Sequence, residues 1–170
     1  MRIVILNGSP RSENTSAMVE AFSEGARSKG HEVNVIHVGK MNIAGCLGCE
    51  YCHGEGEGKC IQKDDMEKVL PLYAECDMVV IASPIYYFGM TAQLYAAIQR
   101  TYSAGDAIKL TKAALLLSSA SPDPFDGAIS TYKGILSFTG VEDTGIITAA
   151  GDENKSEKKL KEIRDFAAGL

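Results

Sequence analysis

The sequence lacks an excess of basic charge and lacks a long apolar run, and these two absences exclude several classes of protein. Seventeen Lys and Arg residues stand against 22 Asp and Glu residues, a formal net charge of −5. Binding to nucleic acid or to an anionic membrane requires a basic surface. No apolar stretch approaches the roughly 20 residues that cross a bilayer. We therefore expect neither a nucleic-acid partner nor a membrane.

An export signal, a linker and an internal repeat are also missing. The apolar stretch at residues 2–7 is short and runs directly into a Gly turn, whereas a signal peptide carries a longer apolar segment. Five cysteines without such a signal indicate reduced thiols in the cytoplasm rather than disulfides. A chain of 170 residues with 45% hydrophobic content suits one folded unit. We expect a single cytoplasmic domain over residues 1–170.

Short apolar runs alternate with helical patterns along the whole chain. Strands are expected at residues 2–7, 32–38, 77–82, 113–118 and 145–149, and helices at 14–30, 91–102, 129–140 and 160–167. A further short helix begins at Asp64-Asp65 and should end or kink at Pro71, and the charged stretch 152–161 should be the solvent-facing side of the last helix. This alternation predicts an α/β fold, a doubly wound five-stranded parallel sheet with helices on both faces.

Ligands of such sheets bind beyond the carboxyl ends of the strands, where the strand order reverses. The loop after the first strand, residues 7–16, reads NGSPRSENTS. Ser9, Thr15 and Ser16 offer hydroxyl groups and Arg11 offers charge at a helix N-terminus, where free N–H groups and the helix dipole favour an anion. The loop suits a phosphate monoester, and the same residues also suit a simple well-capped helix.

Other phosphate-binding classes are excluded by their motifs. No Gly-Lys-Ser/Thr of a Walker loop follows the first strand, and the Gly-x-Gly-x-x-Gly dinucleotide fingerprint is absent. A response-regulator receiver has the same kind of sheet but needs an acidic pair after the first strand and an Asp after the third. This chain has Asn7-Gly8 and Ser83-Pro84 at those places.

The third strand leads into three consecutive aromatic residues, Tyr86, Tyr87 and Phe88. Three neighbours cannot all face one core, so a planar aromatic ligand is a suitable partner for the exposed ones. Alternatively, one aromatic side chain packs inward with Ile85 and a dimer interface covers another.

The two loops together resemble the NAD(P)H-dependent FMN reductase family of flavodoxin-like oxidoreductases. The resemblance covers nearly the whole chain and rests on two motifs: Gly8-Ser9-Pro10-Arg11 with Asn14-Thr15, and Ser83-Pro84-Ile85-Tyr86-Tyr87 with Gln93-Leu94. It implies a flavodoxin-like fold, FMN as cofactor, NAD(P)H as electron donor and a homodimer. It also implies an enzyme that passes electrons to a quinone, a flavin or a similar small-molecule acceptor.

The resemblance assigns site residues in three loops. The FMN phosphate would be held by Ser9, Arg11, Asn14, Thr15 and Ser16. The isoalloxazine would be lined by Pro84, Ile85, Tyr86, Tyr87 and Phe88, and its other edge by Ser118, Ser119 and Ala120. Family members often carry a Gly-rich turn at this last place, where the present chain reads SASPDP at residues 119–124. No catalytic side chain is expected, because the flavin carries the chemistry.

A cysteine-rich loop is expected at residues 39–63, which have no clear period. Cys46, Cys49, Cys52 and Cys60 lie in it, and four thiolates in one short loop suit a [4Fe–4S] cluster or a tetrahedral zinc ion. The spacing is similar to the compact cluster motif of the iron–sulfur flavoproteins, a branch of the same family. Free thiols on a mobile loop are the third alternative. Cys76 is expected in the core.

A second class of function stays open from the sequence. The protein is either an enzyme with a small-molecule acceptor or an electron carrier, of the flavodoxin type or with a cluster, that docks on protein partners. His53, which lies beside the Gly-rich run of the cysteine loop, is expected to be solvated rather than a metal ligand.

Overall fold

A parallel sheet runs through the protein. The computed structural model describes the backbone of residues 1–170 and the side chains of residues 1–105 and 108–170. Five strands pair in the order β2-β1-β3-β4-β5, and every pair is parallel. This 2-1-3-4-5 order is that of the flavodoxin-like doubly wound fold, so the predicted fold class is confirmed. The order reverses between β1 and β3, where a ligand site is expected.

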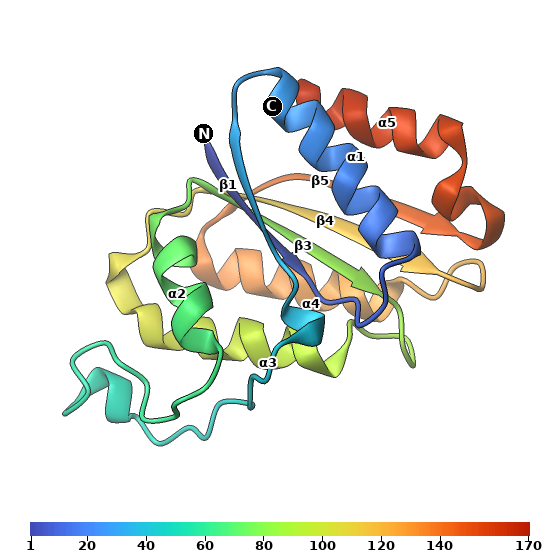
Figure 1. Ribbon diagram of the computed structural model, residues 1–170. Coiled ribbons are helices and arrows are strands. Elements are labelled where there is room, and N and C mark those ends of the chain that lie inside the picture. Colours follow the sequence, from blue (N-terminus) through green and yellow to red (C-terminus); the bar gives the residue numbers. More distant parts are fainter.

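The strands and helices alternate as predicted, and Figure 1 shows the two helical layers on either side of the sheet. The strands are β1 (Arg2–Asn7), β2 (Glu32–Ile36), β3 (Met78–Pro84), β4 (Lys112–Ser119) and β5 (Glu142–Ala150). The α-helices are α1 (Asn14–Ser28), α2 (Met66–Glu75), α3 (Ala92–Arg100), α4 (Asp126–Thr139) and α5 (Glu157–Ala168). Four short 3₁₀ helices are η1 (Val38–Lys40), η2 (Tyr51–His53), η3 (Thr101–Ala107) and η4 (Gly151–Lys155).

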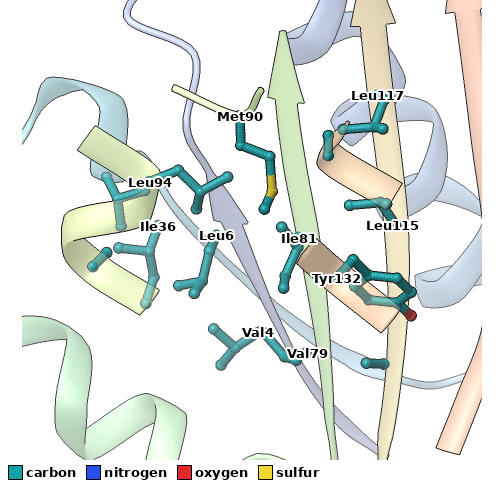
Figure 2. Close-up of a cluster of buried hydrophobic side chains, with 14 of the residues drawn as sticks. Val4, Leu6, Ile36, Val79, Ile81, Met90, Leu94, Leu115, Leu117 and Tyr132 are labelled. Atoms are coloured by element: carbon teal, nitrogen blue, oxygen red, sulfur yellow. The ribbon is translucent and has the colours of Figure 1, made fainter. Parts of the chain in front are cut away.

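Each face of the sheet has its own core, because alternate strand residues point to opposite faces. One core packs α1 and α5 against the sheet and contains Ile3, Ile5 and Phe22. The other packs α2, α3 and α4 on the opposite face, and Figure 2 shows Leu6 and Ile81 from the strands meeting side chains of the helices. The three central strands, β1, β3 and β4, are buried on both faces, which explains their continuous apolar sequence.

Of the two expectations for Pro71, that it would end α2 or kink it, the first is wrong. Pro71 lies inside the helix, which continues to Glu75. Proline removes one backbone hydrogen bond, here to the carbonyl of Glu67, and Glu67 is exposed. Burial of Met66 and Val69 against the sheet supplies the stabilisation that a proline-containing helix needs, because tertiary packing contributes most of a helix's stability.

The end of the chain also differs from the prediction. The last strand begins at Glu142, three residues before the predicted Gly145. The prediction missed this start because the first residues of the strand are exposed and carry no apolar pattern. The charged stretch 152–161 is not one helix face: residues up to Lys155 belong to η4, and α5 begins after the N-cap Ser156. Asn154, expected to be wet, is 1% exposed.

The cysteine-rich loop is irregular apart from η1 and η2, as predicted, and lies beyond α2 and α3 on one side of the sheet (Figure 1). Cys76 is 1% exposed and lies in the core, as predicted. Burial raises the pKa of its thiol to about 11. In the described part of the chain, helices of the length and apolarity needed to cross a membrane are absent.

Candidate functional site

The loops that follow β1, β3 and β4 meet around one hollow at the carboxyl edge of the sheet. The hollow encloses about 420 Å³, including its open mouth. It combines the three sequence segments that were predicted to form the site, although more than 100 residues separate the first from the last. Its lining residues are Ser9, Arg11, Glu13, Asn14, Thr15, Pro84, Ile85, Tyr86, Ser118, Ser119 and Ala120.

Not every predicted residue reaches this hollow. Ser16 does not line it, and its hydroxyl donates to the carbonyl of Arg11 at 3.3 Å and accepts from the Asn7 amide at 3.3 Å. Tyr87 is fully exposed and Phe88 is 70% exposed, and neither lines the hollow. Glu13 does line it and was not predicted. Sequence reasoning did not include Glu13, because a carboxylate is not expected beside a bound anion.

The loop after β1 is held in shape by its own hydrogen bonds. The Ser9 hydroxyl donates to the carbonyl of Arg11 at 2.7 Å and accepts from the Arg11 N–H at 3.2 Å, and the Asn7 side chain accepts from the Ser9 N–H at 2.9 Å. Thr91, the N-cap of α3, donates its hydroxyl to the carbonyl of Gly8 at 2.8 Å. The loop is therefore preorganised by contacts from its own residues and from α3.

Two glycines let the backbone pass through this crowded place. A Cβ on Gly8 would lie 2.7 Å from the Leu94 Cβ, and a Cβ on Gly39 would lie 2.5 Å from the carbonyl oxygens of Gly8 and Ser9. Contacts this short are repulsive, so only glycine fits where η1 passes beneath the loop.

The N-terminus of α1 opens into the hollow with its first N–H groups available. Glu13 is the N-cap residue, and in the described structure its side chain makes no capping hydrogen bond to the helix. Asn14 and Thr15 occupy the first turn and line the hollow, so the alternative of a well-capped helix is not supported. Arg11 lies 3.8 Å from the Glu13 carboxylate, and both side chains are exposed. This N-terminus provides dipole and donors for an anion.

The loop after β4 is tied to α1 across the hollow. The hydroxyls of Thr15 and Ser118 share a hydrogen bond of 2.7 Å, and the Ile85 N–H donates to the Ser118 carbonyl at 2.8 Å. Asn154 of η4 supports the same loop by donating to the Ser119 carbonyl at 2.8 Å. Sequence reasoning missed this support because Asn154 stands in a strongly charged stretch.

The aromatic loop ends in a tight and strained turn. Tyr86 and Gly89 exchange two backbone hydrogen bonds, of 3.0 and 3.2 Å, across it. The two central residues, Tyr87 and Phe88, have φ angles of 49° and 63°, the left-handed pair that a type I′ turn requires. This region favours Gly, Asn and Asp, and bulky residues in it are outliers. The turn points Tyr87 and Phe88 away from the hollow while Tyr86 stays at its edge.

A second, narrow hollow lies in the cysteine-rich loop and encloses about 350 Å³ including the open solvent at its mouth. All four of the predicted ligands line it, together with residues from the end of α3 and from η3. Cys46 and Cys49 are exposed, while Cys52 and Cys60 are half-buried. Burial raises the pKa of the Cys52 thiol, and the nearby charges of Cys60 and Glu50 add to the effect. Among the described side chains, no three His, Cys, Asp or Glu residues converge on a metal position.

A buried arginine that is part of an ion pair lines this second hollow. Arg100, the last residue of α3, is 2% exposed and donates from Nη1 and Nη2 to the two carboxylate oxygens of Asp64, at 2.7 and 3.2 Å. Although burial opposes the charge on Asp64, hydrogen bonds from Arg100 and from two backbone N–H groups lower the pKa of the carboxyl. Sequence reasoning missed Arg100. Its signal was its spacing of three from Ala97 and six from Leu94, on the buried stripe of α3.

His53 is exposed, as predicted, but it is also packed. Its ring lies 4.3 Å from the ring of Tyr102, and its Nε2 is 3.1 Å from the Tyr102 carbonyl oxygen. The Tyr102 hydroxyl donates to the Glu50 carboxylate at 3.0 Å. These contacts attach the cysteine-rich loop to η3.

Comparison with known proteins bears on both hollows. The family model for NADPH-dependent FMN reductases matches residues 1–145. An iron–sulfur flavoprotein of Archaeoglobus fulgidus is 40% identical over 101 residues, which are 59% of this chain and 45% of that protein. The chain spans about half the length of the curated relatives it matches.

Solved structures share the fold over the whole chain. An NAD(P)H:quinone oxidoreductase from Methanothermobacter marburgensis superposes with a TM-score of 0.72 at 21% identity, covering 100% of this chain and 96% of that one. An FMN-dependent NADH-azoreductase from Bacillus anthracis, solved with FMN, superposes with a TM-score of 0.73 at 16% identity, covering 100% and 99%. At these identities the likeness shows the fold alone.

Proposed function

Because the chain belongs to the NADPH-dependent FMN reductase family, we propose that it binds FMN in the hollow at the carboxyl edge of the sheet and passes electrons from NAD(P)H to a small-molecule acceptor. One observation carries this proposal: the loops after β1, β3 and β4 converge on one hollow. This is where the doubly wound fold places its ligands. The azoreductase with the same fold contains FMN.

The residues of the hollow fit FMN. Asn14 and Thr15 present the free first turn of α1, and Arg11 adds a positive charge at its rim, so the phosphate belongs at this end. Pro84, Ile85 and Tyr86 supply an apolar wall for the ring. The backbone of Ser118 to Ala120 would lie along the remaining side. These assignments follow the predicted motif for all but Ser16, Tyr87 and Phe88.

FMN, when bound, supplies the chemistry by accepting a hydride from a nicotinamide and releasing the electrons to an acceptor. The protein's share is binding, orientation and exclusion of water. The Thr15–Ser118 hydrogen bond fixes the distance between the phosphate loop and the wall that follows β4. Tyr86, which is 43% exposed at the edge of the hollow, would contact whatever stacks on the open face of the ring. The nicotinamide and the acceptor would use this face in turn.

Two measurements test the proposal. The purified protein should bind FMN more tightly than riboflavin, because only FMN offers a phosphate to the α1 N-terminus; titration by flavin fluorescence measures both affinities. The FMN-loaded protein should oxidise NADH or NADPH when a quinone or free flavin is added. Equal affinity for riboflavin would contradict the phosphate site, and FMN binding without nicotinamide oxidation would favour an electron carrier.

A second candidate function rests on the cysteine hollow. Its four cysteines line one space together with a buried guanidinium whose Nε has no geometric hydrogen-bond partner among the described residues, and the relatives with 28–40% identity are named iron–sulfur flavoproteins. The donor set fits a [4Fe–4S] cluster, once Cys46, Cys49, Cys52 and Cys60 close around it. As an alternative we therefore propose an iron–sulfur flavoprotein that passes single electrons to a protein partner. Four thiolates also suit zinc, which metal analysis separates from iron.

A further inference from the structure

The buried side chain of Arg100 has one nitrogen, Nε, to which the described structure gives no hydrogen-bond partner. Arg100 is among the largest fully buried side chains of the protein, and a buried charge normally has all its polar atoms paired. Its Nη1 donates to the carbonyl of Ala44 at 3.0 Å and to Asp64 at 2.7 Å, and its Nη2 donates to Asp64 at 3.2 Å. Its Nε, also buried, has no hydrogen-bond partner in the structure as described.

The orientation of the guanidinium is fixed by these contacts. Ala44 and Asp64 lie on either side of the four cysteines along the chain, so the two ends of the cysteine-rich segment are both fastened to Arg100. Because the guanidinium is planar and its Nη groups are occupied by Asp64 in a bidentate pair, the direction of Nε–H is set by the fold. Lysine has no planar group and cannot reproduce this arrangement.

The side chain that carries this Nε–H group is part of the wall of the cysteine hollow. Arg100 lines that hollow with all four cysteines of the loop. Although burial disfavours the charge, the hydrogen bond and charge of Asp64 raise the pKa of Arg100, and a charge and a hydrogen-bond contribution from nearby Cys60 add to the rise. The group that lines the hollow with the cysteines is therefore a permanent cation whose Nε has no geometric hydrogen-bond partner among the described residues. Acidic groups near it are Asp64, which it pairs with, and Glu50, which accepts from Tyr102.

We propose that Arg100 is a positioning residue that donates its Nε–H to a sulfur atom of the [4Fe–4S] cluster in this hollow and thereby raises the cluster's reduction potential. The proposal rests on the cluster-bearing candidate function above. Hydrogen bonds to cluster sulfurs and nearby charge are among the factors that set such potentials. A donor and a positive charge both favour the reduced form, which carries one more negative charge.

The test compares Arg100→Lys and Arg100→Gln with Arg164→Lys. Arg164 is a half-buried arginine that pairs with Glu24 and Glu157, far from the cysteines, so its variant controls for the chemical change alone. Each protein is reconstituted anaerobically with iron and sulfide. The measurements are iron and sulfide per chain, the midpoint potential from a dye-mediated titration followed by EPR, and FMN content with thermal melting as a check of folding.

The potential of Arg100→Lys should shift in the negative direction, and that of Arg100→Gln should shift further, while Arg164→Lys keeps the wild-type value. If Arg100→Gln does not fold, the midpoint potential of Arg100→Lys alone tests the proposal. An unchanged potential in folded Arg100→Lys overturns the proposal, and so does loss of iron with no shift to measure, because both assign Arg100 a purely structural role. A wild-type protein that takes up no iron overturns the proposal together with the cluster. The FMN reductase function is judged separately, by flavin binding and nicotinamide oxidation.

Discussion

Single residues of the hollow at the carboxyl edge, the proposed flavin hollow, have separable roles. Thr15 is 2% exposed and bonded to Ser118, so it shapes the site from within, whereas Arg11 is exposed and already lies near Glu13. Leaving a buried hydroxyl without its hydrogen-bond partner costs more free energy than removing an exposed charge whose contacts water already screens. We therefore expect Thr15 to contribute more to FMN binding than Arg11 does.

Replacing Thr15 with Ala should weaken FMN binding by about 1–2 kcal/mol, roughly 5- to 30-fold in Kd, because the Ser118 hydroxyl loses its partner and the phosphate loses a donor. Arg11→Ala should weaken it less. Ser28→Ala, in the last turn of the same helix, serves as the control and should leave the affinity unchanged. Flavin fluorescence titration measures all three. Wild-type FMN affinity in both Thr15→Ala and Arg11→Ala would mean that the loop starts α1 but does not bind the phosphate.

A second residue-scale prediction concerns the strained turn. Changing Tyr87 to Asn and Phe88 to Gly together should stabilise FMN-free protein by roughly 1–3 kcal/mol, because each bulky residue in the left-handed region costs about 1–2 kcal/mol. Urea unfolding measures the free energy. Asp123→Gly is the control: its φ is 57°, but Asp tolerates this region, so a smaller rise is expected. A less stable double variant would show that the two aromatic side chains pack in the folded protein.

At the scale of elements, α3 connects the two hollows. Its N-cap Thr91 holds the loop after β1 through the Gly8 carbonyl, and its last residue, Arg100, lines the cysteine hollow. Nine residues at 1.5 Å each make the helix about 14 Å long. The rigid element that shapes one hollow thus also shapes the other.

The close packing of η1 beneath the loop after β1 leads to a prediction about glycines. Gly39→Ala should destabilise the protein by roughly 1–3 kcal/mol, because its Cβ would meet backbone atoms of Gly8 and Ser9 that cannot move aside. FMN affinity should fall with it. Gly134→Ala is the matched control: it lies within α4 with nothing within 4 Å of the new Cβ, and should stabilise by about 0.5–1 kcal/mol. Equal stability of the two variants in urea would contradict the close approach.

At the scale of the whole molecule, the two proposed sites, which differ in chemistry, share one sheet. The flavin hollow lies at the carboxyl edge, and the cysteine-rich loop lies beyond α2 and α3 (Figure 1). Because different loops form them, loss of one should leave the other intact.

Anaerobically reconstituted protein should hold about four irons per chain, and Ser at any one of Cys46, Cys49, Cys52 or Cys60 should abolish that iron, since a cluster needs all four thiolates. Cys76→Ser is the control. This thiol is buried, with a pKa of about 11, and only donates to the Tyr73 carbonyl, so iron should be unchanged. Every variant should still bind FMN. Iron-free and zinc-free wild-type protein after reconstitution would leave an FMN reductase with a thiol loop.

The sequence alone determined the alternation of strands and helices, the strand count and the three loops that meet at the carboxyl edge of the sheet. Strands buried on both faces read as continuous apolar runs, and amphipathic helices repeat every three or four residues, so both signals are local. The motif residues of the loops after β1 and β3 are local as well. The prediction of elements failed where tertiary packing overrode or hid the local signal: at Pro71, which does not end α2, at the exposed start of β5, and in the charged stretch 152–161, where η4 precedes α5 and Asn154 is buried.

Only the tertiary structure decided which side chains face each hollow. Tyr86, Tyr87 and Phe88 look equivalent in the sequence, but backbone hydrogen bonds between Tyr86 and Gly89 force a turn that sends two of them outward. Arg100 and Asp64 are 36 residues apart, and the sequence shows their charges without showing that they meet. The reason is physical: burial and pairing depend on contacts between distant segments, which no local pattern encodes.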